Sequence, residues 1–453
     1  MAVSKGTSVD YISLLAELDA FLVANHVLTI AINFGGTGYV VGDILTVAGG
    51  TTSHVGRIIV TTVAVGVITG ARIHDSGAYT VNPGLAANAV TGGSGTTATF
   101  NLTMESDPWT VRLSSTIFTT ERVRIYSGTG GGGVYVGLRT YQEDTGARQA
   151  RNWCLFGCSS YNGALPWYQQ PDINTDGGFS NATGAMTGAA AEGHYMVLKD
   201  NDAFPMSYWF YVTNRRIIVI TKLFDGVTTT PRYASCYMGL LNPMGTSAEF
   251  PYPPFIAGSS GSSRTAWDDL APAFQFSGIT QLYGITGNTG PGAYYSVDGF
   301  WKDVKNSSGT FGGSSRTESN VHTVYPCGQM NVAARPNNND IVPDVAGALQ
   351  WENIINMSGN FSTASVAELW PTPDSAGEKR VIVPCVLTIS NSVIAADYHI
   401  VGELDGVYWT SAAGTVQATS EDLISDAANG NVYSMFANGV YAQLDGFMAI
   451  RET

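Results

Sequence analysis

Pairs of carboxylates are the side chains of this sequence that come nearest to a catalytic set. Cleavage of a glycosidic bond uses two carboxyl groups that flank the bond. Such pairs occur as Asp268 with Asp269, Asp172 with Asp176, and Glu403 with Asp405. On a strand, Glu403 and Asp405 would share one face because side chains alternate with a period of two. The Leu-Asp-Gly at 404–406 is also a preferred turn sequence, and we favour a hairpin turn there over an acid–base pair.

Histidines and cysteines offer no metal or redox site in the sequence. The six histidines are His26, His54, His74, His194, His322 and His399, and no two have the spacing of three to five that is typical of a zinc pair. Cys154 and Cys158 are four positions apart beside Trp153 and Phe156, which favours two buried small residues over a reactive pair. We therefore predict no metal and no cofactor.

Glycine-rich segments resemble two catalytic motifs without matching either. The segments GSSGSS (258–263) and GGSGTT (92–97) lack the Gly-Xaa-Ser-Xaa-Gly of a nucleophile elbow. GTGGGG (128–133) is followed by a Val-Tyr-Val strand pattern, whereas a phosphate-binding loop continues into Lys-Ser/Thr and a helix. Together with the carboxylates, these segments predict that the chain is not an enzyme.

Aromatic side chains beside prolines are the strongest candidates for a contact site. They occur in ALPWYQQP (164–171), FPYPPF (250–255) and ELWPTP (368–373). Such loops anchor protein interfaces or stack on sugar rings. Proline also lowers the entropy lost on docking, which favours an interface. The candidate interface or glycan-contact residues are Trp167, Tyr168, Tyr252, Phe255 and Trp370.

Composition and charge exclude several classes of protein. The 453 residues include 44% hydrophobic and only 13% charged residues, so a large core is expected and global disorder is excluded. The 36 acidic residues outnumber the 22 basic ones, with no basic run longer than Arg215-Arg216, which argues against nucleic-acid binding. The preference for Arg over Lys indicates that much of the surface contacts other chains.

Neither a membrane segment nor a secretory signal is predicted. The longest apolar stretch, FLVANHVLTIAI (21–32), is interrupted by Asn25 and His26 and is too short to span a bilayer. The N-terminal residues lack the apolar run and cleavage site of a signal peptide. We expect synthesis in a cytoplasm with five mostly buried, reduced cysteines.

One helix and many strands must position these side chains. Residues 8–25 predict an amphipathic helix, capped by Ser8 or Asp10, in which Ile12, Leu15, Leu18, Phe21 and Leu22 form the apolar face. The remainder consists of short runs of Val, Ile, Thr, Tyr and Phe between Gly, Asn, Pro and Ser clusters, which is typical of strands and turns. Within it, YWFYVTNRRIIVITKLF (208–224) predicts a hairpin with its turn at Thr213-Asn214-Arg215.

Residues 33–104 form a Gly-rich block that is nearly free of charge. GTGYVVGDILTVAGG, followed by GAYTVNPG, resembles a small β module that recurs in phage virion proteins as an inserted or appended decoration. An unrelated small β domain is the alternative. Because a helix precedes the block and the strand pattern of Trp109, Val111 and Leu113 follows it, we predict an insertion into a body of 105–453.

The body carries a second resemblance, in the order of its motifs. WTVRL near 109, GVYVGLRTYQ near 134, YWFYVTNRRIIVITKL at 208, the segment from ASCYMGLLNP at 234, and IVGELDGVYWTS at 400 occur in the order of a family of β-rich phage virion structural proteins. The resemblance implies a component of the tail, neck (collar) or baseplate and assigns no catalytic residue.

The sequence thus predicts a mainly β, β-sandwich-like multi-domain protein with one N-terminal amphipathic helix and an inserted β module. The expected parts are 1–32, a helical segment packed on the body, the module 33–104, and a β-rich body in two parts, 105–260 and 261–453. The expected function is structural, in a virion, with other virion proteins and further copies of the chain as partners. A receptor- or glycan-binding tail protein that contacts host surface glycans is the alternative. A polysaccharide-degrading spike is a third hypothesis, weakened because β-helix repeats are missing.

Overall fold

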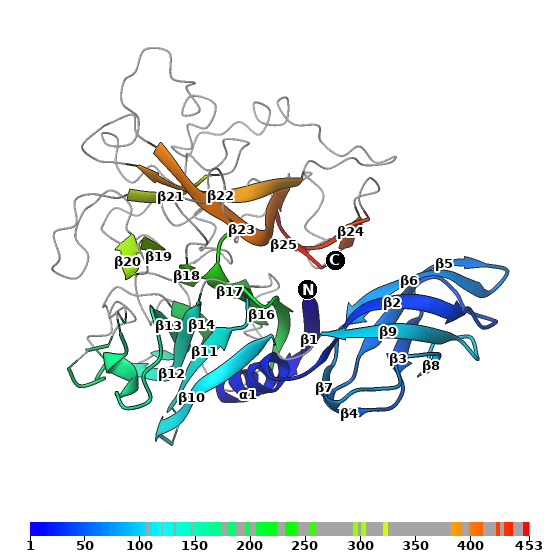
Figure 1. The fold of residues 1–453 in the computed structure, drawn as a ribbon, viewed down its shortest axis with the longest axis horizontal. Helices are drawn as coiled ribbons and strands as arrows, with labels where there is room; N and C mark the ends of the chain where they lie inside the picture. Colours follow the sequence, from blue (N-terminus) through cyan, green and yellow to red (C-terminus); the bar gives the residue numbers. More distant parts are fainter. Residues whose placement is uncertain are drawn as a thin grey trace, which may run out of the picture.

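The computed structural model describes a mainly β protein. The described residues are 1–105, 108–119, 121–130, 133–145, 148–171, 173, 179–180, 182–186, 195–199, 205–223, 232–242, 254–258, 293–297, 300–304, 320–324, 382–390, 398–410, 423–425, 430–437 and 447–452. Within these ranges the chain forms several sheets and a single α-helix (Figure 1), which confirms the predicted mainly β class.

The helix α1 (Tyr11–Leu22) is shorter than predicted. Asp10 is the N-cap, and its Oδ1 accepts hydrogen bonds from the backbone N–H groups of Ile12 and Ser13 at 2.8 and 2.6 Å. Such a cap contributes about 1 kcal/mol to helix stability. The buried face differs in part from the predicted one, because Tyr11 and Leu14 are buried while Ile12 is only partly buried.

A strand that the sequence analysis missed precedes the helix. Strand β1 (Ala2–Ser8) pairs antiparallel with β15 (Met206–Val212), so that Ala2 lies opposite Val212. Gly6 lies opposite Tyr208, and a Cβ atom at Gly6 would lie 2.5 Å from the Tyr208 hydroxyl oxygen. The close approach of the tyrosine ring therefore requires glycine at this point of the strand.

A seven-stranded sheet forms the middle layer of the body, in the order β1-β15-β16-β17-β18-β19-β20. Its further strands are β16 (Arg216–Leu223), β17 (Arg232–Leu240), β18 (Pro254–Gly258), β19 (Ala293–Val297) and β20 (Phe300–Val304). β15 and β16 pair antiparallel with Val212 opposite Ile217. The hairpin predicted at 208–224 is confirmed.

A five-stranded meander packs on one face of this sheet. Its strands are β10 (Trp109–Phe118), β11 (Glu121–Gly128), β12 (Tyr135–Thr145), β13 (Arg148–Cys158) and β14 (Tyr195–Lys199). Alternate side chains of both sheets, including Trp153 and Phe210, share one hydrophobic core with α1. The helix is also held by polar contacts, since Trp153 Nε1 donates to the Tyr11 carbonyl and the Tyr126 hydroxyl donates to Asp19.

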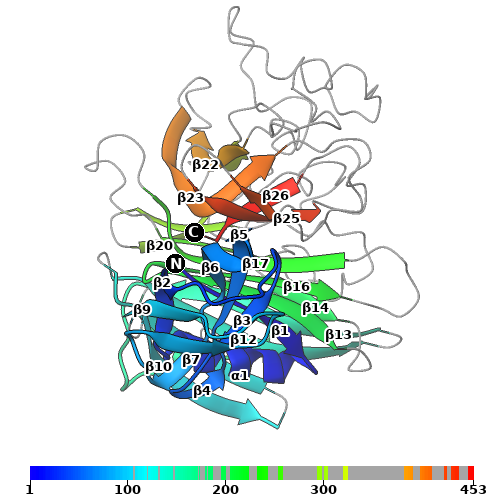
Figure 2. The same ribbon diagram turned by 90° about the vertical axis from the view of Figure 1, so that its right-hand side faces the viewer.

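A six-stranded sheet covers the other face of the middle layer (Figures 1 and 2). Its order is β21-β22-β23-β26-β25-β24, with β21 (Asn320–Val324), β22 (Ile382–Ser390), β23 (Tyr398–Thr410), β24 (Leu423–Ser425), β25 (Val432–Ala437) and β26 (Phe447–Arg451). The ring of Phe436 contacts those of Trp209, Tyr211 and Tyr233. β15 is therefore buried on both faces, which explains its continuous apolar sequence.

Residues 26–105, named here the β2–β9 unit, extend to one side of these layers (Figure 1). The strands are β2 (His26–Phe34), β3 (Ile44–Val47), β4 (Thr51–His54), β5 (Arg57–Ala64), β6 (Val67–Asp75), β7 (Ala78–Val81), β8 (Asn88–Thr91) and β9 (Thr99–Glu105). They form a six-stranded sheet and the β4-β7 pair around a separate hydrophobic core that includes Tyr79 and Phe100. β2 begins at His26, so strand structure starts before the predicted boundary at 33.

Candidate functional site: buried charge junctions and a braced aromatic loop

Three parts of the chain that are distant in sequence meet at the carboxylate of Glu452. The residue follows β26 and is only 3% exposed. Its Oε1 accepts a hydrogen bond from Lys5 Nζ of β1 at 2.5 Å, and its Oε2 accepts one from Arg72 Nη1 of β6 at 2.9 Å. The hydroxyl of Ser434, in β25, donates to the same carboxylate. The junction therefore joins β1, the β2–β9 unit and the C-terminal sheet.

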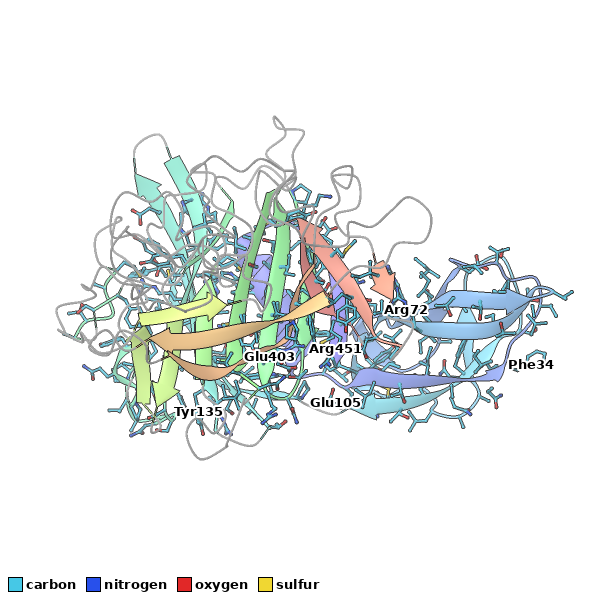
Figure 3. All side chains as sticks on the ribbon, turned by 90° about the horizontal axis from the view of Figure 1, so that it is seen from above. Phe34, Arg72, Glu105, Tyr135, Glu403 and Arg451 are labelled. Carbon is cyan, nitrogen blue, oxygen red and sulfur yellow. The ribbon has the colours of Figure 1, made fainter. Side chains whose placement is uncertain are left out.

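The electrostatics of Glu452 follow from these partners. Burial alone would raise the pKa of the carboxyl group, because water no longer solvates the charge. The charge and hydrogen bond of Lys5, with the Ser434 hydroxyl and the Arg72 charge, outweigh burial and hold the pKa below its usual value. Glu452 is therefore ionised at neutral pH and acts as an internal cross-link. Figure 3 shows Arg72 where the β2–β9 unit meets the rest of the chain.

A second junction joins the β2–β9 unit to β1. The buried Asp75 accepts hydrogen bonds from the backbone N–H of Lys5 at 3.0 Å and from Gly77 at 2.9 Å. It also contacts His54 Nε2 at 2.6 Å. The hydrogen bond with Asp75 raises the pKa of His54, so the His54 ring becomes positively charged and forms an ion pair with Asp75 as the pH falls.

Two further histidines of this region, His26 and His74, have pKa values that are shifted downward. Burial lowers the pKa of His26, whose Nδ1 donates to the Gly77 carbonyl at 2.7 Å. Burial and the nearby Lys5 charge lower the pKa of His74, whose buried Nδ1 has no hydrogen-bond partner among the described residues. Both rings are neutral at pH 7 and resist protonation.

The third junction corrects the prediction for residues 404–406. The Leu-Asp-Gly is not a hairpin turn, because β23 runs without interruption from Tyr398 to Thr410. Pairing with β22 shifts between Pro384 and Val386, so that residues 404–407 bulge away from β22. Asp405 Oδ2 accepts from Nε of the fully buried Arg216 at 3.1 Å. The ion pair between Arg216 and Asp405, which are 189 positions apart in sequence, thus holds the tripeptide in a strand instead of the turn that its local sequence favours.

Further contacts hold this bulge against the middle sheet. Asp405 Oδ1 accepts from Asn242 Nδ2 at 3.2 Å and lies 3.5 Å from an Arg451 nitrogen. Gly406 has φ +74, and a Cβ atom there would overlap the Arg216 guanidinium. The backbones of Asn242 and Glu403 exchange two hydrogen bonds of 2.8 Å. Glycine at 406 is therefore required both by the backbone and by the arginine.

The acid–base alternative for Glu403 and Asp405 is weakened by these contacts. The pKa of Glu403 is raised by burial and by the Asp405 charge. Burial opposes ionisation of Asp405 as well, but the Arg216 and Arg451 charges keep its pKa below the usual value. Opposite shifts in a carboxylate pair are typical of acid–base sites. Here, however, both oxygens of Asp405 already have donor partners, which favours a structural ion pair.

The predicted aromatic contact loop is braced from within. Trp167 and Tyr168 belong to the 3-10 turn Trp167–Gln169. The side-chain amide of Gln170 is buried, donates to three carbonyl oxygens of the loop (Asn162, Leu165 and Pro166) and accepts from the Asn162 N–H. The loop is thus preorganised without regular secondary structure.

The two aromatic rings of this loop differ in exposure. Trp167 is 8% exposed and packs against Phe156 and Phe179, with the guanidinium of Arg139 over its ring. Its indole is therefore a support of the loop and not a surface platform in this chain. Tyr168 is only partly buried and keeps a contact surface.

The other predicted contact residues are placed as follows. Phe255 lies in β18, opposite Gly239 of β17 and Tyr295 of β19, and so belongs to a strand and not to a loop. Tyr252 and Trp370 lie outside the described residues. Cys154 and Cys158 both lie in β13 and are buried, as predicted.

The junction residues were not found by sequence reasoning, apart from Asp405. Lys5 and Glu452 are separated by 447 positions, and no spacing rule connects them. The one usable signal was the low charge content, since isolated ionisable groups in such a chain are often paired inside.

Within the described residues, no helix is long and apolar enough to span a membrane. The same ranges contain no group of three or more His, Cys, Asp or Glu side chains suited to a metal ion. Comparison with known proteins found neither a matching family model nor a matching curated protein.

Proposed function

We propose that this chain is a non-enzymatic structural component of a bacteriophage virion, located at the tail, baseplate or neck. The motif order from Trp109 to Ser411 supports the virion assignment through its resemblance to such proteins. In this proposal the chain is made in the host cytoplasm and joins the particle through contacts with other virion proteins and with copies of itself.

The observation that carries the proposal is the Glu452 junction. A part that stays in an assembly must keep its own segments in fixed relative positions. One buried carboxylate ties β1, the β2–β9 unit and the C-terminal sheet together through Lys5, Arg72 and Ser434. Asp405 ties the same C-terminal sheet to the middle sheet through Arg216. The charged side chains of these two junctions thus serve internal cohesion.

A finer description of the fold belongs to the same proposal. The shared core of the five- and seven-stranded sheets supports a sandwich-like body, and the separate core of the β2–β9 unit supports an insertion. Replacement of residues 26–105 by a short linker should leave a folded body with a cooperative, though weakened, unfolding transition. An insoluble or non-cooperative product would contradict the insertion.

Size-exclusion chromatography with light scattering, followed by a glycan array, tests the function. A defined oligomer that binds no glycan supports the structural role. Release of reducing sugars from host capsule, lost on neutralisation of one carboxylate, would contradict it and favour a degrading spike.

The glycan-binding alternative is favoured by one observation, the braced loop that carries Tyr168. A rigid loop with a partly exposed aromatic ring is suited to stacking on a sugar. Selective glycan binding that is lost in Tyr168→Ala and retained in Tyr39→Phe, a change at a buried ring of the β2–β9 unit, would establish this alternative.

A further inference from the structure

The end of the β2–β9 unit that points away from the body exposes a group of apolar side chains. This group, named here the tip, consists of Phe34, Val40, Val41, Val65 and Val67. Val41 is 60% exposed and Val65 is 104% exposed. Figure 3 shows Phe34 at the far end of the unit, remote from Arg72 and Glu105 at the body. Exposed apolar groups of this kind mark interaction sites more often than isolated surface residues do.

Hydrogen bonds hold the segments of the tip together. The backbone N–H of Tyr39 donates to the Gly66 carbonyl at 3.0 Å, and that of Ile68 donates to Gly35 at the same distance. The Asp43 carboxylate accepts from the backbone N–H groups of Val40 and Ser94 and from the Ser94 hydroxyl. The tip is therefore a preorganised surface built from three chain segments.

The turn at Val65 and Gly66 is locally unfavourable. It links β5 to β6, with Ala64 opposite Val67, and both central residues have positive φ, at +50 and +77. This two-residue turn favours Asn, Asp or Gly at its first position. A β-branched residue in the left-handed region is an outlier, and the cost corresponds to roughly a 5- to 30-fold loss in the folding equilibrium.

Nothing within the described chain offsets that cost, because the Val65 side chain is fully exposed and packs on nothing. A residue held in an unfavourable backbone conformation, with no stabilising contact inside the fold to offset the cost, indicates a functional position. We propose that the tip inserts into an uncharged, apolar pocket of another protein of the assembly. This inference rests on the proposed virion function.

The charge and the size of the tip favour an apolar pocket of another protein over a lipid surface or a second copy of the chain. The segments 33–44, 61–70 and 92–98 contain one charged residue, Asp43, whose carboxylate is hydrogen-bonded to Val40 and Ser94, and the five apolar side chains of the tip carry no charge of their own. Basic residues that would attract anionic lipid are missing from these segments. Five side chains are also far fewer than the about 20–30 residues per side of a stable interface, whereas a pocket can surround a few anchors.

The test compares wild-type chain with Val65→Asn, Val65→Thr and the control Val81→Asn in particles assembled with each. Val81 is an exposed valine of β7 in the same unit, outside the tip. Quantitative mass spectrometry measures the chain per particle. We expect about a tenfold loss for both Val65 variants, as for other lost apolar contacts in pockets, and none for Val81→Asn.

Thermal unfolding of the purified chains separates a surface role from a folding defect. Val65→Asn should raise the unfolding midpoint because Asn tolerates positive φ, while Val65→Thr keeps the β-branch and should not. The combination of a more stable chain with poorer incorporation is the expected signature. A Val65→Asn chain that is no more stable than wild type would overturn the argument from turn cost.

The remaining outcomes identify which idea fails. Wild-type chain missing from particles would overturn the proposed function and this inference with it. Wild-type and variant chains in equal amounts would overturn the tip alone. Binding to neutral phosphatidylcholine vesicles that Val65→Asn abolishes would assign the tip to lipid, and a dimer that the same change abolishes would assign it to a second copy.

Discussion

Neutralisation of Glu452 is the change that most directly tests the role of its junction. Glu452→Gln keeps the size of the side chain but leaves Lys5 and Arg72 without their counter-ion. Removal of one partner of a buried ion pair costs about 3–5 kcal/mol. The side chains of Lys5 and Arg72 are 17% and 15% exposed, so water solvates them in part. We therefore expect a loss of about 2–3 kcal/mol in the free energy of unfolding.

Urea unfolding at pH 7, followed by tryptophan fluorescence, measures this loss. Glu17→Gln is the matched control, since Glu17 is a half-buried carboxylate of α1 that takes no part in the Glu452 junction. A double-mutant cycle that combines Glu452→Gln with Lys5→Met should show that the losses in unfolding free energy of the two single variants are not additive. Destabilisation below about 0.5 kcal/mol, or strict additivity, would refute the cross-link.

The pH dependence of the same variant gives an independent check. The pKa of Glu452 is lowered on folding, so its contribution is present above the unfolded value of 4.5 and is lost as the pH falls through the folded value. The wild-type chain should lose more free energy of unfolding than Glu452→Gln when the pH is lowered from 5 to the lowest pH at which both chains still fold. Parallel stability curves for the two chains would contradict this account.

Three further results are expected. Asp405→Asn leaves the fully buried Arg216 without its ion pair and should cost about 3–5 kcal/mol in urea unfolding, whereas a cost below about 1 kcal/mol would contradict the junction. The pKa of His74 is lowered on folding, so protonation of the unfolded chain below its value of 6.5 destabilises the fold, and His74→Gln should lose less stability than wild type when the pH is lowered from 7 to 5. The pKa of His54 is raised on folding, so its protonation stabilises the fold, and His54→Gln should lose more stability than wild type over the same range. Burial raises the pKa of Cys236 to about 12, so peptide mapping should find this thiol unmodified by a thiol reagent at pH 8 until the chain unfolds, and fast labelling of native protein would count against its burial.

Local sequence signals predicted the elements whose determinants are local. Asp10, one of the two residues predicted as the cap, is the N-cap of α1, and this could be predicted because capping depends on the next three residues. The hairpin at 208–224 followed from two apolar runs around a short polar turn. Strand β1 was missed because its sequence, AVSKGTS, has little strand propensity and forms through pairing with β15.

Long-range ionic contacts account for what local signals could not predict. Leu-Asp-Gly at 404–406 favours a turn by propensity, but the buried Arg216 draws Asp405 into a strand bulge. The Glu452 junction joins the two ends of the sequence, so no window of residues contains it. The loop at Trp167 was identified from its aromatic and proline content, yet the exposure of its rings depends on Phe156 and Phe179, which lie outside the motif.

Electron microscopy of purified particles labelled with an antibody against this chain tests the central claim most directly. A virion component that acts by assembly should place the label at one fixed position on the tail, baseplate or neck of every particle. Mature particles that carry no label, together with catalytic turnover by the purified chain, would contradict the account.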